Sequence, residues 1–298
     1  MPVPLLLGAG LVAAGLLAWR TWYVRHVEGA DRDRPRNADG ELAGAEGFAL
    51  PRPGAPAVLL VHGAGDTPQT LRGLGAYLHA RGFAVAAPRL PAHGTSIREF
   101  RHVSSRALRD AVHRAHEALR AEHRWVAIVG LSMGGALSAI ETASERDVPA
   151  LVLLAPYLDL PLPIRIVSHL GWLLGPLLPY FSAEDSRSVR DPRAATESRA
   201  YGVFTPAGLR TLREVADGAR AVLPRIVAPT LIIQSRQDNR VAERVAEQAF
   251  AALGPADKRL EWISDGGHVI TVDYGRDRVF AAVADWLDTH GASSLLRS

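Results

Sequence analysis

The sequence predicts an α/β protein, in which a mostly parallel sheet carries helices on both faces. From residue 57 on, short apolar runs alternate with helix-like stretches, and this alternation is typical of a parallel sheet with right-handed crossovers. One apolar run, residues 125–129, leads into a Gly-x-Ser-x-Gly pattern around Ser132, and a helical pattern begins just past it. Later in the chain, polar side chains directly follow two further apolar runs. Because parallel sheets place ligands at the carboxyl ends of their strands, we expect these side chains to share one edge.

The composition is that of a folded protein. Of the 298 residues, 48% are hydrophobic and 22% are charged, which favours a globular chain with a sizeable core over a disordered one. The net charge is only +3, and the basic residues are scattered among acids, so no nucleic-acid partner is predicted. Without cysteine, the chain has no disulfide, no thiolate metal site and no cysteine nucleophile. We predict no metal site.

Residues 1–24 are predicted to form a transmembrane anchor. Residues 1–19 carry no charged side chain, and about 20 apolar residues suffice to span a bilayer as a helix. Trp19, Trp22 and Tyr23 then resemble an interfacial aromatic belt. A cleaved signal peptide, one alternative, would need a basic region before the apolar core, and this region is missing. A core helix of the main domain is the other alternative.

The residues that follow set the expected orientation of the anchor. Basic side chains come after the apolar run and none precedes it, so the positive-inside rule places the C-terminal domain in the cytoplasm. Residues 25–45 are charged and rich in Gly, Ala and Asp, which indicates a linker. The main domain is then residues 46–298, and its first strand is expected near residues 46–50.

The first half of the main domain is predicted to alternate strands and helices. Residues 57–62 form a continuous apolar run, as in a strand that is buried on both faces. Thr67 and Pro68 suit the N-cap and first position of a helix. The expected elements are a strand at 57–62, a helix from 67 to 80, a strand at 83–88, a loop at 89–96 and a helix from 104 to 122.

Ser132 is the candidate nucleophile. In a nucleophile elbow the serine occupies a strained turn between strand and helix, with its hydroxyl group exposed. Side chains at Gly130 and Gly134 would block the packing of the strand against the helix and the approach of a substrate. The pattern alone is equally compatible with an ordinary glycine-rich turn, so its context decides.

The loop after the strand at 57–62 is predicted to supply part of an oxyanion hole. A serine that cleaves esters needs backbone N–H groups aimed at the oxyanion. One comes from the residue after the nucleophile, Met133, and the other from the early loop, for which Ala64 is our candidate. Alternatively, the glycines of this loop merely turn the chain. His62 and His93 are expected to organise loops, not to catalyse.

Residues 157–223 are predicted to form a cap insertion. The connection from the strand that ends near residue 155 to the one at 230 is far longer than an ordinary loop. Residues 160–181 are strongly apolar, but their four prolines, together with Arg165 and His169, argue against a second membrane span. We expect this apolar surface to cover the active site and receive an acyl chain, or to dip into a membrane surface. Alternatively, it packs only on itself and the core.

The candidate base and acid lie in the second half. Asp238 follows a strand at 230–235, and His268 lies in a glycine-bearing loop after a strand at 258–263. An imidazole activates a serine by taking its proton, and a carboxylate orients that imidazole. Asp265, a rival acid, lies only three residues before His268 and is interpreted as a local hydrogen-bonding residue. Helices are expected at 241–253 and 277–287.

With these residues in place, the chain resembles the α/β-hydrolase superfamily, and more closely its small bacterial carboxylesterases and monoacylglycerol lipases. The likeness covers about residues 55–290 and lies in the stretches LLVHGAGDTP at 59–68, PRLPAHGT at 88–95, GLSMGG at 130–135 and GHVITVD at 267–273. The chain order Ser132, Asp238, His268 is also that of α/β-hydrolases. The resemblance implies the α/β-hydrolase fold, a Ser132-Asp238-His268 triad, Ala64 and Met133 as oxyanion donors, and no cofactor. The anchor and the long, proline-rich cap depart from the family pattern.

We therefore predict a membrane-anchored serine esterase or lipase that cleaves small-molecule or lipid esters, such as acylglycerols, through an acyl-enzyme. A peptidase, an amidase or a thioesterase on the same fold is the alternative within enzymes. A membrane-tethered binding protein without catalysis is the alternative outside them.

Overall fold

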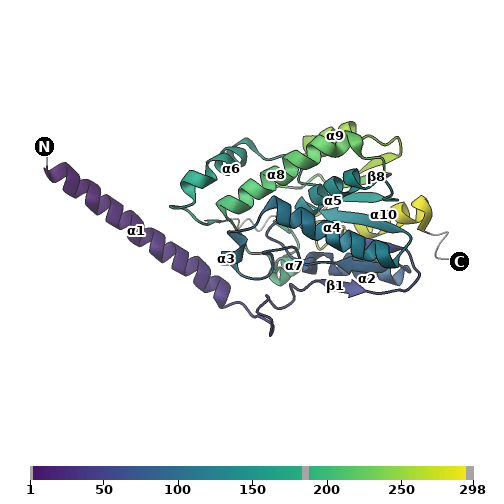
Figure 1. Ribbon diagram of the computed structural model, residues 1–298, viewed down its shortest axis with the longest axis horizontal. Helices are drawn as coiled ribbons and strands as arrows, with labels where there is room; N and C mark the ends of the chain where they lie inside the picture. Colours follow the sequence, from purple (N-terminus) through teal and green to yellow (C-terminus); the bar gives the residue numbers. More distant parts are fainter. Residues whose placement is uncertain (1–2, 183–187, 293–298) are drawn as a thin grey trace.

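A seven-stranded sheet forms the centre of the computed structural model, which describes residues 3–182 and 188–292 (Figure 1). The strand order is β1-β3-β2-β4-β5-β8-β9, and every neighbouring pair is parallel except β1 with β3. This confirms the predicted mostly parallel sheet. The strands are β1 (Phe48–Leu50), β2 (Ala57–Val61), β3 (Ala84–Ala87), β4 (Val126–Leu131), β5 (Leu151–Leu154), β8 (Thr230–Ser235) and β9 (Lys258–Ile263).

Helices cover both faces of the sheet, as predicted. Side chains alternate along each strand, so Leu59 joins one buried cluster while Val58 and Leu60 join another. The first cluster packs against α4 (Ser105–Glu122), α5 (Met133–Ser144), α8 (Pro206–Val222) and α9 (Glu243–Ala252). The second packs against α2 (Arg72–Ala80) and α10 (Arg276–Leu287). The central strands are therefore apolar on both sides, which is why they appear as unbroken apolar runs in the sequence.

One local prediction needs correction. The helix expected from Thr67 begins as a 3-10 turn, η1 (Pro68–Leu71), and the Thr67 side chain makes no capping hydrogen bond. The loop expected at 89–96 is present. A short helix that was not predicted, α3 (Ile97–Phe100), follows it, because the Ser96 side chain accepts a hydrogen bond from Glu99 N–H. The helix expected from Ser104 begins as predicted, since the Ser104 hydroxyl accepts from Ala107 N–H.

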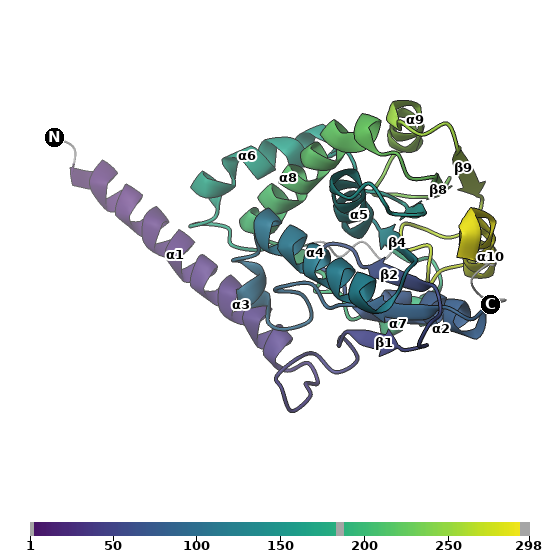
Figure 2. The same cartoon turned by 45° about the vertical axis from the view of Figure 1, so that its right-hand side comes forward.

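The N-terminal helix α1 (Val3–Arg32) projects from the domain as a rod (Figures 1 and 2). In the described part of the chain, no helix is both long and apolar enough to cross a membrane. The predicted anchor at 1–24 is therefore not supported, although residues 1–2 and the side chains of residues 3–10 lie outside that part. The predicted cytoplasmic placement depended on this anchor and stays a prediction.

The predicted linker at 25–45 is corrected by the structure. Residues 25–32 continue α1, because the end of this helix is docked on the domain. Glu28 accepts hydrogen bonds from Arg98 and from the Tyr180 hydroxyl, and Asp31 accepts one from the backbone N–H of Ile97. The residues after α1 are also held in place, since Leu42 and Ala45 are buried in the core.

The long connection between β5 and β8 adds no strand to the seven-stranded sheet in its described part. It contains α6 (Leu162–Leu174), β6 (Phe181–Ser182), α7 (Pro192–Glu197), β7 (Val203–Phe204), α8 and the 3-10 turn η3 (Leu223–Arg225). Helix α6 lies along α8, and Figure 2 shows both at the end of the domain nearest α1. Large apolar side chains of this segment are exposed, so they do not pack only on themselves and the core: Leu162, Ile166, Leu170, Trp172, Leu173 and Leu177.

Candidate active site

Ser132 occupies a strained turn between β4 and α5. Its φ is +56° and its ψ is −119°, in a region that L-residues rarely adopt. The turn closes tightly, because a Cβ at Gly130 would lie 2.3 Å from the carbonyl oxygen of Gly134. A Cβ at Gly134 would lie 2.1 Å from the carbonyl oxygen of Val61. Both glycines are therefore required by close backbone packing, as the sequence predicted.

His268 and Asp238 lie at the same sheet edge as Ser132. His268 follows β9, and its Nε2 lies 2.8 Å from Ser132 Oγ. The other ring nitrogen, Nδ1, lies 2.8 Å from Oδ2 of Asp238, which follows β8. In the sequence, His268 lies 30 positions after Asp238 and 136 positions after Ser132. The structure thus brings together three residues that are far apart in the chain.

The surroundings of Asp238 keep it ionised. Its side chain is fully buried, and burial by itself raises the pKa of a carboxyl group. The charge of His268 and its hydrogen bond, with the backbone N–H groups of Val241 and Arg240, outweigh this effect and lower the pKa of Asp238 below its ordinary value. These two N–H groups donate to Oδ1 over 2.9 and 2.7 Å. Oδ2 is left for His268 and for Nε2 of Gln234.

The two predicted oxyanion donors belong to segments that border Ser132. Met133 is the first residue of α5, and Ala64 belongs to the loop after β2, where a Cβ on the neighbouring Gly63 would lie 3.3 Å from Cβ of Ser132. Among the described residues, neither the Ala64 N–H nor the Met133 N–H has a hydrogen-bond acceptor. Both groups are therefore available to an oxygen atom of a bound substrate.

His62 and His93 organise the loops, as the sequence predicted. Nε2 of His62 accepts a hydrogen bond from Leu90 N–H, so its Nδ1 donates to the carbonyl oxygen of Gly63. Burial lowers the pKa of His62 well below its ordinary value and lowers that of His93 to about 4. Both imidazoles are neutral, and the two rings stack edge to face.

Asp265 has an exposed side chain. Among the described residues, its hydrogen-bond partner is the hydroxyl group of the adjacent Ser264, at 3.4 Å. The interpretation of Asp265 as a local hydrogen-bonding residue agrees with this placement.

Sequence reasoning missed Asp273, which braces the loop of His268. Its buried carboxylate accepts hydrogen bonds from Gly267 N–H and from the backbone N–H groups of Arg190 and Asp191 in the connection that precedes α7. The same connection holds the loop from the other side, because Ser188 O accepts from His268 N–H over 2.9 Å. The only available signal in the sequence was that Asp273 ends the GHVITVD stretch. Two of its backbone partners lie far away in the chain, so this stretch alone does not reveal its role.

Asp66 is a second missed residue near the site. It lies in the loop of Ala64, is 8% exposed, and accepts a hydrogen bond from the Thr70 hydroxyl over 2.7 Å. Burial raises its pKa to about 6, although Thr70, the Thr67 N–H and the charge of His268 act in the opposite direction.

Tyr157 packs edge to face on the His268 ring, and burial raises the pKa of Tyr157 to about 12.

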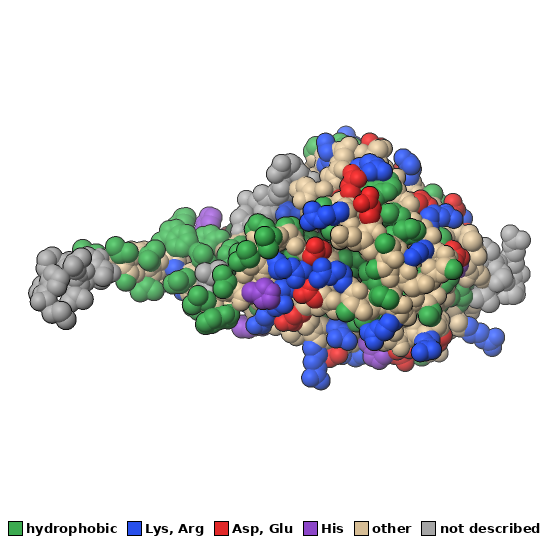
Figure 3. Space-filling model, turned by 90° about the horizontal axis from the view of Figure 1, so that it is seen from above, with side chains coloured by type: hydrophobic (Ala, Val, Ile, Leu, Met, Phe, Trp, Pro, Cys, Tyr) green, Lys and Arg blue, Asp and Glu red, His purple; other side chains and the backbone are tan. Residues whose placement is uncertain are grey.

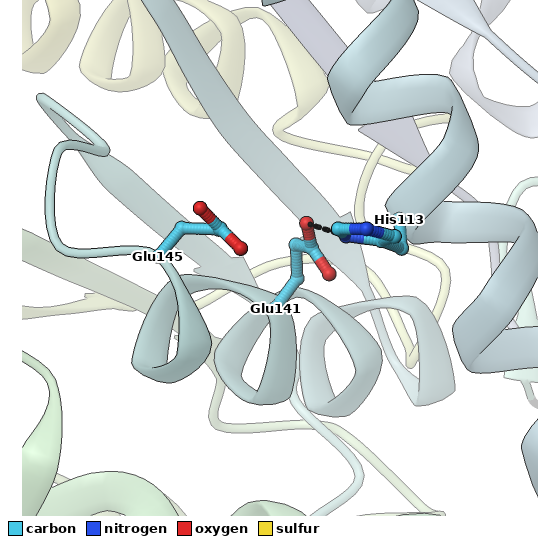
Figure 4. A group of neighbouring side chains, drawn as sticks. All are labelled: His113, Glu141 and Glu145. Carbon is cyan, nitrogen blue, oxygen red and sulfur yellow. Dashed lines mark hydrogen bonds and ion pairs between the residues drawn. The ribbon is translucent and has the colours of Figure 1, made fainter.

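A separate cluster contains residue types that bind metals. His113 of α4, Glu141 of α5 and Glu145, which directly follows α5, place one potential ligand atom each within 4.8 Å of one another (Figure 4). These atoms already have protein partners. Glu141 Oε1 lies 3.1 Å from Nδ1 of His113 and 2.9 Å from Nδ1 of His116, and Glu145 pairs with Arg120. The cluster is accounted for as a link between α4 and α5.

Comparison with known proteins places the chain in a family. The model of the family described as serine aminopeptidase, S33, matches residues 53–274. The chain belongs to this family of α/β-hydrolases. The match covers the whole sheet except β1 and begins after α1. The α/β-hydrolase superfamily predicted from the sequence is therefore confirmed.

Two relatives of this hydrolase are named for the cleavage of esters. It is 27% identical to a thermostable monoacylglycerol lipase of Bacillus sp. (strain H-257), over 84% of this chain and 96% of that protein. It is 28% identical to a carboxylesterase of Bacillus subtilis (strain 168), over 79% of this chain and 93% of that protein. The prediction of a carboxylic ester hydrolase agrees with both names.

Solved structures support the fold. A metagenome-derived lipolytic enzyme superposes with a TM-score of 0.77 at 24% identity, over 83% of this hydrolase and 98% of that chain. The monoacylglycerol lipase of Paleococcus ferrophilus superposes with a TM-score of 0.72 at 22% identity, over 82% and 98% of the two chains. These superpositions confirm the predicted fold.

Proposed function

We propose that this hydrolase cleaves carboxylic esters by nucleophilic catalysis, with Ser132 as nucleophile, His268 as general base and acid, and Asp238 as the group that orients His268. The observation that carries the proposal is the pair of 2.8 Å contacts that join Ser132 Oγ to His268 Nε2 and His268 Nδ1 to Asp238. A serine hydroxyl is a weak nucleophile without such a base. The names of the two Bacillus relatives support an ester as substrate, with monoacylglycerols as the class to test first.

The reaction has two halves. Ser132 Oγ attacks the ester carbonyl carbon while its proton moves to His268 Nε2, and the N–H groups of Ala64 and Met133 bind the resulting oxyanion. The intermediate collapses, the alcohol leaves with the proton from His268, and an acyl-Ser132 ester remains. His268 then takes a proton from water as the water oxygen attacks the acyl carbon, and it returns this proton to Ser132 Oγ when the carboxylic acid leaves.

Fluorophosphonate labelling tests the nucleophile. The purified chain should acquire one covalent label, visible as a single mass increment, and Ser132→Ala should acquire none. Turnover of p-nitrophenyl esters should fall by about 10⁶-fold in the same variant. A parent chain without label, or equal labelling of both proteins, would refute the serine mechanism.

Peptide hydrolysis is the second candidate, because the matching family is described as serine aminopeptidase. A series of p-nitrophenyl esters of increasing acyl length and a series of aminoacyl p-nitroanilides separate the two substrate classes. We expect kcat/KM to be higher for the esters. Faster turnover of the anilides, absent in Ser132→Ala, would assign peptidase activity to the same site.

A further inference from the structure

A cavity of about 260 Å³ lies between α6 and α8, apart from the catalytic residues. The described residues that line it include three arginines, a histidine and a tryptophan, and none of them is acidic. These side chains are Arg101, His169, Trp172, Arg210 and Arg213. Figure 3 views the molecule from the side of α6 and α8, and shows basic side chains gathered next to hydrophobic ones toward the protruding α1.

The positive charge of this cavity is incompletely neutralised. Arg210 and Arg213 approach Glu214 and Asp217 only to 3.8 Å, beyond hydrogen-bond distance. Asp217 is engaged more closely by other bases, Arg165 at 3.1 Å and Arg220 at 2.8 Å. Arg101 is also weakly paired, because its ion-pair partner Glu28 lies 3.9 Å away and is bound more tightly by Arg98. A surplus of guanidinium charge therefore faces the cavity.

Two further features of the cavity suit an anion. Nε of Arg213 is buried and has no hydrogen-bond partner among the described residues, although a buried N–H group without an acceptor is costly. The N-terminus of α8 also borders the cavity through Thr205, Pro206 and Ala207, and the positive end of a helix dipole favours negative charge. The unpartnered Nε of Arg213 and the N-terminus of α8 thus border the same cavity.

We propose that this cavity binds a phosphate group, carried either by a soluble phosphate ester or by a phospholipid headgroup. Guanidinium groups bind phosphate oxygens in a planar, bidentate geometry, so several arginines around one cavity suit phosphate better than a single-point anion. A phospholipid would also find apolar contacts at the rim, where Trp172 is 74% exposed and Leu173 is 55% exposed. The site is independent of the proposed ester hydrolysis, because no residue of the triad lines it.

The test compares Arg210→Gln with Arg106→Gln in the full chain. The Arg210 side chain is 54% exposed, so its replacement leaves the fold intact. Arg106 lies on α4, is 91% exposed and provides the same change in charge away from the cavity. Titration calorimetry with glycerol 3-phosphate reports on a soluble ligand. Flotation with phosphatidylcholine vesicles, with and without phosphatidylglycerol, reports on a headgroup.

We expect Arg210→Gln to weaken binding about tenfold or more, since a charged hydrogen bond is lost, while Arg106→Gln binds as the parent does. Saturable binding of glycerol 3-phosphate assigns a soluble ligand. Binding that requires phosphatidylglycerol and is lost in Arg210→Gln assigns a lipid headgroup. The proposal is overturned if the parent binds neither probe, or if both variants bind equally well.

Discussion

Two buried contacts between a carboxylate and an imidazole have nearly the same local geometry in this protein. His268 Nδ1 lies 2.8 Å from Asp238 at the sheet edge, and His116 Nδ1 lies 2.9 Å from Glu141 between α4 and α5. The surroundings differ. The second ring nitrogen of His268 reaches Ser132, whereas within the described residues neither His116 nor His113 is hydrogen-bonded to a hydroxyl group. In the proposed mechanism, an acid and an imidazole act as a catalytic unit only where the fold places a strained serine in front of them.

The largest difference between the two sites should be seen when their histidines are replaced. His268→Gln removes the base, and we expect kcat/KM for p-nitrophenyl esters to fall by about 10⁴-fold or more. His113→Gln removes a half-exposed partner of Glu141 and should leave kcat/KM within about twofold of the parent. Steady-state kinetics on both variants decides. Similar losses in the two proteins would show that the contact to Ser132 does not distinguish the sites.

The acids should differ by a somewhat smaller factor. Asp238→Asn keeps the shape of the side chain but disturbs the orientation and tautomer of His268, so kcat should fall about 10³- to 10⁴-fold with little change in KM. Glu141→Gln should retain the parent kcat at a temperature where it is folded. Near-UV circular dichroism checks the fold of each variant. An Asp238→Asn enzyme within tenfold of the parent would contradict the orienting role.

How far the sequence predicts these sites depends on the range of the interactions that build them. The elbow of Ser132 is encoded locally, because its strand, its glycines and its helix are contiguous and the strained turn needs small neighbours on both sides. The edge that collects Ser132, Asp238 and His268 follows from the parallel sheet, since each residue comes just after a strand.

Other features depend on packing between segments that no local pattern connects. Asp273 accepts hydrogen bonds from backbone N–H groups 82 and 83 positions away. Nearly every residue has such a group, so the sequence does not show which ones bind Asp273. His113 and His116 are spaced to share one face of a helix, but their common partner, Glu141, lies on another helix, 28 positions after His113 and 25 after His116. Helix α1 extends to Arg32 because Glu28 and Asp31 find partners on the folded domain. Because those partners are distant in the sequence, the charged composition of residues 25–32 by itself suggested a linker.

Glu141 should matter for stability rather than for catalysis. Burial alone raises the pKa of Glu141, but His116 and His113 outweigh it and lower the net pKa below the ordinary value. We expect Glu141→Gln to reduce the free energy of unfolding by about 2–3 kcal/mol near neutral pH, because charged hydrogen bonds are lost. Urea denaturation measures this, with the exposed Glu117→Gln as a control expected within about 0.5 kcal/mol of the parent.

The pH dependence of this loss has a definite sign. A carboxyl group with a lowered pKa contributes stability above its unfolded pKa, near 4.5, and the contribution disappears as the pH falls through the folded value. The hydrogen bond to Glu141 raises the pKa of His113, so its contribution is present below about 6.5 and is lost as the pH rises through the folded value. The effect of Glu141→Gln should therefore be largest between these limits. A loss that does not vary with pH would contradict the ionic account.

Asp66 provides the smallest effect and the opposite sign. It is a buried carboxyl group without an imidazole partner, and burial raises its pKa from 3.8 to about 6. A group of this kind contributes stability below its unfolded pKa and loses it as the pH rises through the folded value. Asp66→Asn cannot ionise, so its stability relative to the parent should increase by on the order of 1–2 kcal/mol between pH 4 and pH 7. Urea denaturation at pH 4, 5.5 and 7 measures the trend. The stability of Asp66→Asn relative to the parent could instead stay constant with pH, or change in the same direction as that of Glu141→Gln. Either result would show that the presence of a charged partner does not explain the difference between the two buried carboxyl groups.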